Sequence, residues 1–185
     1  AATKIENVFT SGSVSGDRSI GGLVGSSYEV YSNPKNLISQ SLSVSVISAN
    51  SDVGGLVGAT KSTDIINSYW ATDVSTQFDN TGSSAVNSYA GLSLAKLQCA
   101  TSENTNFITG CVSEDGSDEG LSAGVTLYQD WDPAVWDFGT APDASQQLPG
   151  LKFNGQVFRD GDGDGLLDVD DSFLFDHDND GILDV

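Results

Sequence analysis

Polar and hydrophobic residues alternate over much of the first half of the chain, which is the pattern of β-strands. In residues 41–48, SLSVSVIS, serine alternates with Leu42, Val44 and Val46. Because successive side chains of a strand point to opposite faces, this segment presents one apolar face. Ser, Thr, Val and Gly dominate and strong helix formers are scarce, which also favours strands. The strands are predicted to be short, because turn residues recur at Gly16, Asn33-Pro34 and Asn50.

The alternating segment lies inside a sequence repeat. GGLVG occurs at residues 21–25 and again at 54–58, an offset of 33. Aligned without gaps, residues 5–25 fall on residues 38–58, and a third, decayed copy begins at residue 65. Apolar positions coincide while polar positions drift, which indicates that one face of each copy is buried. The coincident pairs are Ile5/Ile38, Phe9/Leu42, Val14/Ile47 and Ile20/Val53.

Copies that each bury one face against the next form a solenoid. One 33-residue copy accommodates about three short strands and three turns. We therefore predict that residues 1–88 are all-β, a right-handed parallel β-helix of two to three coils. The paired glycines of GGLVG allow close backbone approach at a corner, while Leu23/Val24 and Leu56/Val57 point into the coil or its neighbour. A phosphate-binding loop is the alternative, but no helical pattern follows either copy.

Residues 89–158 are the predicted irregular cap, because the open edge of a solenoid must be covered. Residues 90–98 combine three leucines with good helix formers and predict one short helix. Trp131, Trp136 and Phe138 supply large apolar area for a cap core, with a platform for sugar rings as the alternative. Apolar residues in 151–158 predict one or two final strands.

Three further features of the cap region bear on its chemistry. Asp132 and Asp137 fit turn and cap positions better than the general acid and base of a catalytic pair. Cys99 and Cys111 lie close together in the sequence, in a Ser/Thr/Asn/Gly-rich stretch, where a disulfide is the better interpretation. A metal-binding role for these cysteines is disfavoured, since the chain has a single histidine, His177.

The chain is strongly acidic, with 26 Asp and Glu against seven Lys and Arg and a net charge of −19. This charge disfavours nucleic acids and anionic membrane surfaces as partners. No apolar run is long enough to span a bilayer, so we expect no membrane insertion. The sequence shows neither an initiating Met nor a signal peptide, and we expect a mature or excised part of a longer protein.

The acidity is concentrated at residues 160–185, which carry ten aspartates and no Lys or Arg. Like charges at this density keep a tail extended unless a cation neutralises them. Asp160, Asp162 and Asp164 stand at i, i+2 and i+4 before Gly165, and the same phrase restarts at Asp176. Alternate carboxylates followed by a glycine wrap a loop around one hard cation, and all-oxygen ligands favour calcium.

The predicted calcium ligands fall into two loops, the second ending near the last residue. They are Asp160, Asp162, Asp164, the carbonyl of Leu166, Asp168 and Asp171 in the first loop, and Asp176, Asp178, Asp180 and Asp184 in the second. The phrase D-x-D-x-D-G-x-x-D-x-x-D resembles the thrombospondin type 3 repeat, in which calcium ions form the core of a wire-like stalk. The resemblance implies a calcium-bound extended tail over residues 159–185. A solvated acidic tail without fixed structure is the alternative.

A second resemblance covers most of residues 5–153. VFTSGSVSG with IGGLVG, and SVISANSDVGGLVG, resemble the GLUG motif of large bacterial secreted and surface proteins, some of them IgA-specific metallopeptidases. INSYWATDVSTQ, GLSLAKLQ, WDFG and LPGLKF are similar to the ending that often follows such repeats. The insert that contains Cys99 and Cys111 and the acidic segment 113–120 depart from this pattern.

No catalytic set is recognisable, since H-E-x-x-H, G-x-S-x-G and an oriented Cys–His pair are all missing from the sequence. We expect a non-enzyme, an extracellular structural or adhesive module of a bacterial surface or secreted protein that calcium stabilises. Its expected partner is a host or neighbouring-cell surface protein or glycan. The alternatives are a glycan-binding or accessory module of a secreted peptidase or polysaccharide-degrading enzyme, and a self-associating subunit of an extracellular filament.

Overall fold

The computed structural model describes residues 2–28, 34–61, 63–75, 89–98, 126–128, 130–139, 147–174, 176 and 180–182. The fold is mostly β, as predicted, and the described residues include two helices of one turn each, α1 (Thr72–Ser75) and α2 (Leu94–Leu97). Within these ranges no helix has the length and apolar character needed to cross a membrane. The segment predicted as a helix over residues 90–98 is divided between a strand and α2.

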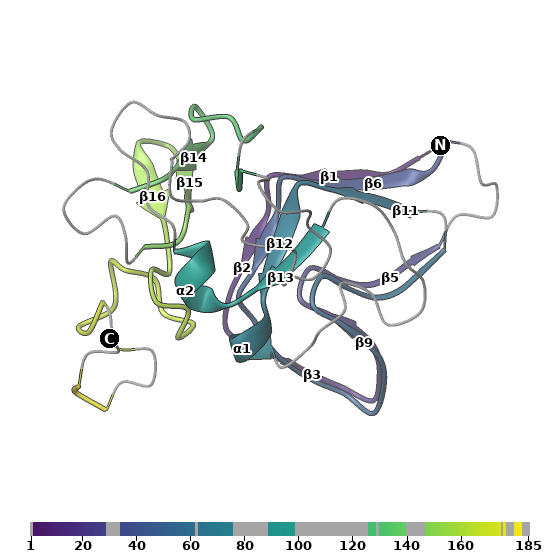
Figure 1. The fold of residues 1–185 in the computed structure, drawn as a ribbon, viewed down its shortest axis with the longest axis horizontal. Helices are drawn as coiled ribbons and strands as arrows, with labels where there is room; N and C mark the ends of the chain where they lie inside the picture. The colour runs from purple at the N-terminus through teal and green to yellow at the C-terminus, as the bar shows by residue number, and fades with distance from the viewer. Residues whose placement is uncertain are drawn as a thin grey trace.

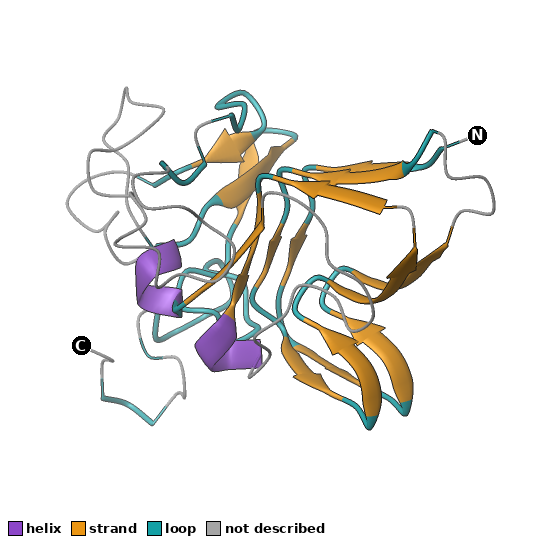
Figure 2. Ribbon diagram, turned by 45° about the vertical axis from the view of Figure 1, so that its right-hand side comes forward, coloured by secondary structure: helices purple, strands orange, loops and turns teal. Residues whose placement is uncertain are grey.

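Residues 4–28, the first tier, lie parallel and in register with residues 36–61, the second tier (Figures 1 and 2). Ile5 pairs with Ile38 and Val14 with Ile47, and the other strand pairs of the two tiers keep the same offset. The first tier contains β1 (Lys4–Glu6), β2 (Phe9–Thr10), β3 (Ser13–Ser15), β4 (Arg18–Gly21) and β5 (Val24–Tyr28). The second contains β6 (Asn36–Ser39), β7 (Leu42–Ser43), β8 (Val46–Ser48), β9 (Ser51–Gly54) and β10 (Val57–Lys61). The gapless alignment of the two copies is therefore confirmed.

Each tier has five short strands where the sequence predicted about three. An extra corner divides them at residues other than glycine with positive φ, a conformation that such residues seldom adopt. Asn7, Gln40 and Asn67 occupy this corner in successive tiers, with φ of 57°, 49° and 45°. Ser19 and Asp52 have φ of 57° and 52° at equivalent positions within β4 and β9. Asparagine is a turn residue, but Gln40 gave no turn signal in the sequence.

A partial third tier follows, as the decayed repeat predicted. β11 (Thr63–Ile66) pairs with β6, with Ile65 opposite Ile38, and β12 (Ser68–Ala71) pairs with β7, with Tyr69 opposite Leu42. The step from the second tier to the third is therefore shorter than the step from the first to the second. β13 (Tyr89–Leu92) then pairs with β12, also in parallel. The sheet with the order β13-β12-β7-β2 therefore has four strands, more than any other described sheet of the stack.

The interior of the stack explains the GGLVG motif. Ile38, Leu56, Val57, Ile65 and Trp70 form its core, with Ile5, Leu23 and Val24 packed against it. A Cβ on Gly22 would overlap Ser43 Oγ, and a Cβ on Gly55 would overlap the Trp70 ring. The paired glycines were predicted to allow close backbone approach at a corner; at the second glycine of each motif the close neighbour is a side chain of another tier.

A second core lies on the outer side of β2, β7 and β12. Leu42 and Val44 point outward, and the alternation SLSVSVIS places serines such as Ser43 toward the interior. Residues from the cap region cover this outer face, including Tyr128, Trp131, Trp136, Phe138 and Leu148. In the described residues, the cap side chains thus pack mainly on a lateral face made by all three tiers, while β13, also in the predicted cap region, pairs with the third-tier strand β12.

The cap ends in an antiparallel sheet with the order β14-β15-β16, formed by β14 (Trp136–Asp137), β15 (Gly150–Phe153) and β16 (Gln156–Phe158). The predicted final strands are therefore present. Trp136 Nε1 donates to Asn7 Oδ1 at 2.9 Å, and Trp131 Nε1 donates to the Asn67 carbonyl at 3.0 Å. The cap is consequently fixed to the corner that Asn7, Gln40 and Asn67 share.

Candidate metal site

The first acidic loop follows β16 directly and packs against the body of the molecule. Asp160 and Asp162 are 0% and 4% exposed. A Cβ on Gly165 would lie 2.9 Å from Gly12 Cα, and one on Gly163 would lie 3.2 Å from Leu94 Cδ1. Because these positions have no side chains, the turn between β2 and β3 and helix α2 can approach the loop backbone closely. The sequence predicted an extended tail here. In the structure the first loop is instead packed against the body.

Two polar contacts add to this docking. Gln98 Nε2, just after α2, donates to the Gly161 carbonyl at 2.8 Å. The Ser11 side chain, from the turn between β2 and β3, is hydrogen-bonded to the Asp160 carboxylate. Sequence reasoning did not find Ser11, Gly12, Leu94 or Gln98 as neighbours of the loop, because no spacing pattern connects positions so far apart in the chain.

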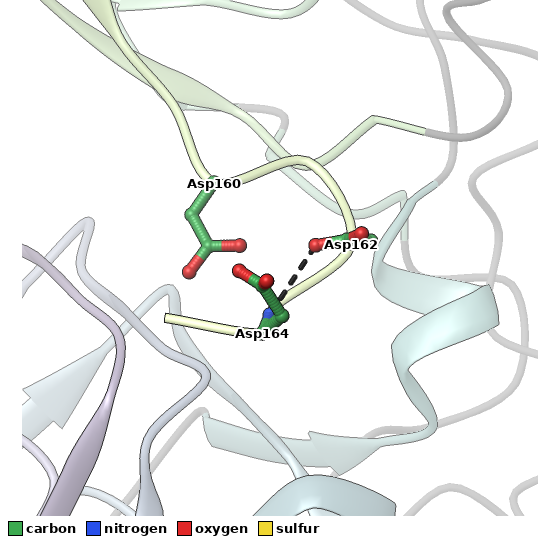
Figure 3. A group of neighbouring side chains, drawn as sticks. All are labelled: Asp160, Asp162 and Asp164. Carbon is green, nitrogen blue, oxygen red and sulfur yellow. Dashed lines mark hydrogen bonds between the residues drawn. The ribbon is translucent and has the colours of Figure 1, made fainter. Parts of the chain in front are cut away.

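The side chains of Asp160, Asp162 and Asp164 converge (Figure 3), with one oxygen of each within 4.8 Å of the others. Backbone N–H groups orient them. Gly163 N and Gly165 N donate to the two oxygens of Asp160 at 2.6 and 2.9 Å, and Leu166 N donates to Asp164 Oδ1 at 2.6 Å. Gly163 and Gly165 have φ of 80° and 99°, which supplies the sharp turn expected from glycine at these positions. The three carboxylates thus present oxygen atoms to one point.

The electrostatics of this loop favour a bound cation. Burial raises the pKa of Asp160 to about 6, although the hydrogen bonds from Ser11 and from the Gly163 and Gly165 N–H groups oppose the shift. Burial also raises the pKa values of Asp162 and Asp168. Burial disfavours the charged forms of Asp160 and Asp162, and a cation at the point where these two carboxylates converge with Asp164 would offset that cost.

Arg159, the residue before the loop, is directed toward the cap. Its Nε donates to the Leu148 carbonyl at 2.8 Å, and its Nη2 forms an ion pair with Asp137. Burial raises the pKa of Asp137, but the Gly139 N–H and the Arg159 guanidinium outweigh it and hold that pKa below its usual value. Asp137 therefore anchors the cap, as the turn-and-cap interpretation predicted. Asp132 accepts a hydrogen bond from Ala134 N at 2.8 Å, a turn contact.

The described residues of the second acidic loop, Asp176 and 180–182, repeat backbone hydrogen bonds of the first. Gly181 N donates to Asp176 Oδ2 at 2.7 Å, just as Gly165 N does to Asp160 Oδ2. Ile182 N donates to Asp180 Oδ1 at 2.8 Å, and Gly181 has a φ of 87°. Asp176 is fully buried, and its N–H donates to Asp162 Oδ2 at 2.9 Å, so the two loops are joined at Asp162.

The remaining predicted ligands lie around this arrangement or outside it. Asp168 Oδ1 accepts from Gly161 N at 2.7 Å and borders the first loop, while Asp171 Oδ1 accepts from Phe173 N at 2.7 Å. Neither belongs to the converging group, and the Leu166 side chain is 47% exposed. Asp178, Asp184, Cys99 and Cys111 lie outside the described residues.

The aromatic residues suggested as a sugar platform are enclosed. Trp131 and Trp136 are 1% and 0% exposed, and their rings lie 4.2 Å apart between centroids. Tyr69 and Tyr128 also pack against Trp131. These side chains form core, as predicted, and do not offer a surface for a ligand.

No family model, curated protein or solved structure matches this chain. Its chemistry therefore rests on the residues themselves. The acidic loops offer hard oxygen ligands, including the buried carboxylates of Asp160, Asp162 and Asp176, which suits the binding of a metal cation.

Proposed function

We propose that the two acidic loops bind calcium and that the chain is a non-catalytic, calcium-stabilised structural module of an extracellular protein. The observation that carries this proposal is the convergence of Asp160, Asp162 and Asp164 in a turn whose hydrogen bond from Gly165 N to Asp160 recurs from Gly181 N to Asp176. Carboxylates at alternate positions before a left-handed glycine match calcium loops better than magnesium or zinc sites.

Calcium has a structural role in this proposal because of where the first loop lies. It touches the turn between β2 and β3 and the end of α2 through Gly12 and Gln98. Filling the loop neutralises buried carboxylates and so stabilises the junction between tail and body. Free calcium is abundant outside cells, which supports an extracellular location for a site of this type.

The stacked tiers support a β-solenoid as the body of the module. Five parallel strand pairs at one constant offset, with an apolar interior, are what successive coils of a parallel β-helix produce. A rigid solenoid suits a structural or adhesive role, in keeping with the resemblance of the GGLVG repeats to the GLUG motif. The resemblance of residues 160–185 to thrombospondin type 3 repeats supports calcium in the same way.

Calorimetric titration of metal-stripped protein with calcium tests the proposal. Binding is expected at about 10⁻⁴ to 10⁻³ M or tighter. At a hundredfold excess over the dissociation constant, calcium adds about 2.7 kcal/mol and raises the melting temperature by roughly 5–10 °C. Magnesium is expected to bind more weakly.

Paired variants locate the site. Asp160→Asn removes a buried ligand and is expected to abolish the heat of the first loop, while Asp176→Asn affects the second. Asp170→Asn is the matched control, because it removes an exposed carboxylate of the same segment and is expected to leave binding unchanged. Equal calcium binding by Asp160→Asn and the parent, or no heat with the parent, would contradict the proposal.

A further inference from the structure

The first tier has an edge that no described strand pairs with, called the free edge below. Each of β1–β5 stands at the end of its sheet, paired on one side with the second tier, and no strand in the described part of the chain pairs with the other side. The Leu42 and Val44 N–H groups donate to the Val8 and Thr10 carbonyls at 2.9 and 2.8 Å. In a parallel ladder, the N–H and C=O groups of Phe9, between these two acceptors, point the opposite way, toward the free edge.

Equivalent residues of the two tiers differ in burial in a way that marks this edge. Ile38, Leu42 and Val57 of the second tier are at most 1% exposed, whereas their equivalents Ile5, Phe9 and Val24 are only half-buried. Ile47 is 3% exposed and its equivalent Val14 is 37% exposed. The two tiers share backbone register and side-chain type. The strands of Ile38 and Leu42, β6 and β7, are paired on both sides, so their difference from Ile5 and Phe9 arises from the missing neighbour of the first tier.

The second tier identifies what fits such an edge. Its own edge is the same surface one repeat later, and the occupant there is the first tier. Polar contacts fix that interface as well: Thr3 N donates to Asn36 Oδ1 at 2.9 Å, and Asn50 Nδ2 donates to Asp17 Oδ1 at 2.9 Å. A segment with the sequence of the first tier therefore has the register and the apolar side chains for this edge.

The charge of the first tier and the path of the chain also favour a segment of first-tier sequence at the free edge. Residues 4–28 contain two basic and two acidic residues, so a like segment meets no net repulsion there. Figure 1 places the N-terminus beside the start of β6, where the chain enters the second tier. A segment joined to the N-terminus would follow the path by which the second tier continues from the first.

We propose that the free edge of β1–β5 is a docking surface for one further tier of the same repeat, joined in the same polypeptide. The proposal rests on the stacked-coil architecture proposed above and not on calcium. If a further tier docks there, the solenoid can be extended at this edge into a longer rod. A capped edge would instead end the solenoid.

The test is a chain extended at its N-terminus by a second copy of residues 2–34, which adds one complete repeat. The extended chain is expected to unfold in one cooperative transition at a melting temperature about 5 °C or more above that of the parent. Hydrogen exchange of the β1–β5 amides is expected to slow by about tenfold or more. A control extension, whose copied unit carries Ile5→Asn, Phe9→Asn and Val24→Asn, is expected to give neither change.

Two results would overturn the proposal. The first is a copied unit that exchanges as an unfolded chain and leaves the melting temperature unaltered. The second is a parent chain that light scattering finds dimeric at micromolar concentration with the β1–β5 amides already protected, because a second copy then occupies the edge. Parallel measurements with calcium and with a chelator separate these results from a failure of the calcium sites, since the proposed stacking is independent of calcium.

Discussion

At the scale of single residues, space inside the stack decides which side chain a position tolerates. Gly55 faces the Trp70 ring and Gly22 faces Ser43 Oγ, and neither glycine has a positive φ. Glycine is therefore needed at these two positions for lack of space and not for an unusual backbone conformation. The sequence revealed the glycines through repetition, but it did not reveal their partners, because Trp70 lies in the decayed third copy.

Gly55→Ala is expected to destabilise the protein by about 1–3 kcal/mol through overpacking against Trp70. The Trp70→Leu background removes the ring atoms, so the same glycine substitution is expected to be nearly neutral there. A double-mutant cycle by chemical denaturation measures this coupling. Equal effects of Gly55→Ala in both backgrounds would show that the contact with Trp70 is not responsible.

At the proposed calcium site, protons are expected to compete with calcium for Asp160. Its pKa in the metal-free protein is raised to about 6 by burial, so the carboxyl takes up a proton as the pH falls through that value. Calcium requires the ionised form, and affinity is expected to fall about tenfold between pH 7 and pH 5 from this group alone. Calorimetric titrations at several pH values measure the trend, and a constant affinity over this range would argue against Asp160 as a ligand.

At the scale of elements, the alternating pattern predicted the strands, but it did not predict which face of a strand is turned toward the solenoid interior. Leu42 and Val44 alternate with serines, and the natural inference directs the leucine and valine into the solenoid. The structure directs them outward, because Gly22 approaches Ser43 so closely that only a small side chain fits inside. The outward apolar face then needs cover, and Trp131 and Trp136 supply it. A one-face pattern cannot distinguish these two arrangements.

The cap sheet and the first acidic loop are joined by the ion pair between Asp137 and Arg159. Asp137→Asn leaves the nearly buried Arg159 without its carboxylate and is expected to cost about 1–3 kcal/mol. The folded-state pKa of Asp137 is lowered, so its contribution is present above the ordinary value of 3.8 and is lost as the pH falls below it. The deficit of the variant should therefore shrink in acid.

Lys152→Met provides the matched control for this ion pair. Lys152 Nζ lies 3.5 Å from Asp137 Oδ2, and its side chain is 39% exposed. An exposed partner of this kind contributes less than about 1 kcal/mol. Unfolding in denaturant at pH 7 and pH 3 compares the two variants, and a larger loss for Lys152→Met would contradict the assignment of Arg159 as the main partner.

At the scale of the whole molecule, charge is segregated along the chain. Residues 1–61 contain four acidic and four basic residues, so the net charge of −19 belongs entirely to residues 62–185. In the sequence, the repeat identified the near-neutral body and the spacing of aspartates identified the acidic loops. The packing of the first loop against the body was not predictable, because local charge repulsion suggested an extended tail and the compensating contacts come from distant residues such as Ser11 and Gly12.

The contact between Gly12 and Gly165 has a consequence for the order in which the molecule folds. It joins positions near opposite ends of the chain, and a contact of such sequence separation forms only after a large loss of chain entropy. The turn that holds Gly12 must already be built from the first and second tiers before the loop can dock on it. We therefore expect the acidic loops to dock late in folding, and with the proposed calcium sites the rate of this step would depend on the calcium concentration that the nascent protein meets.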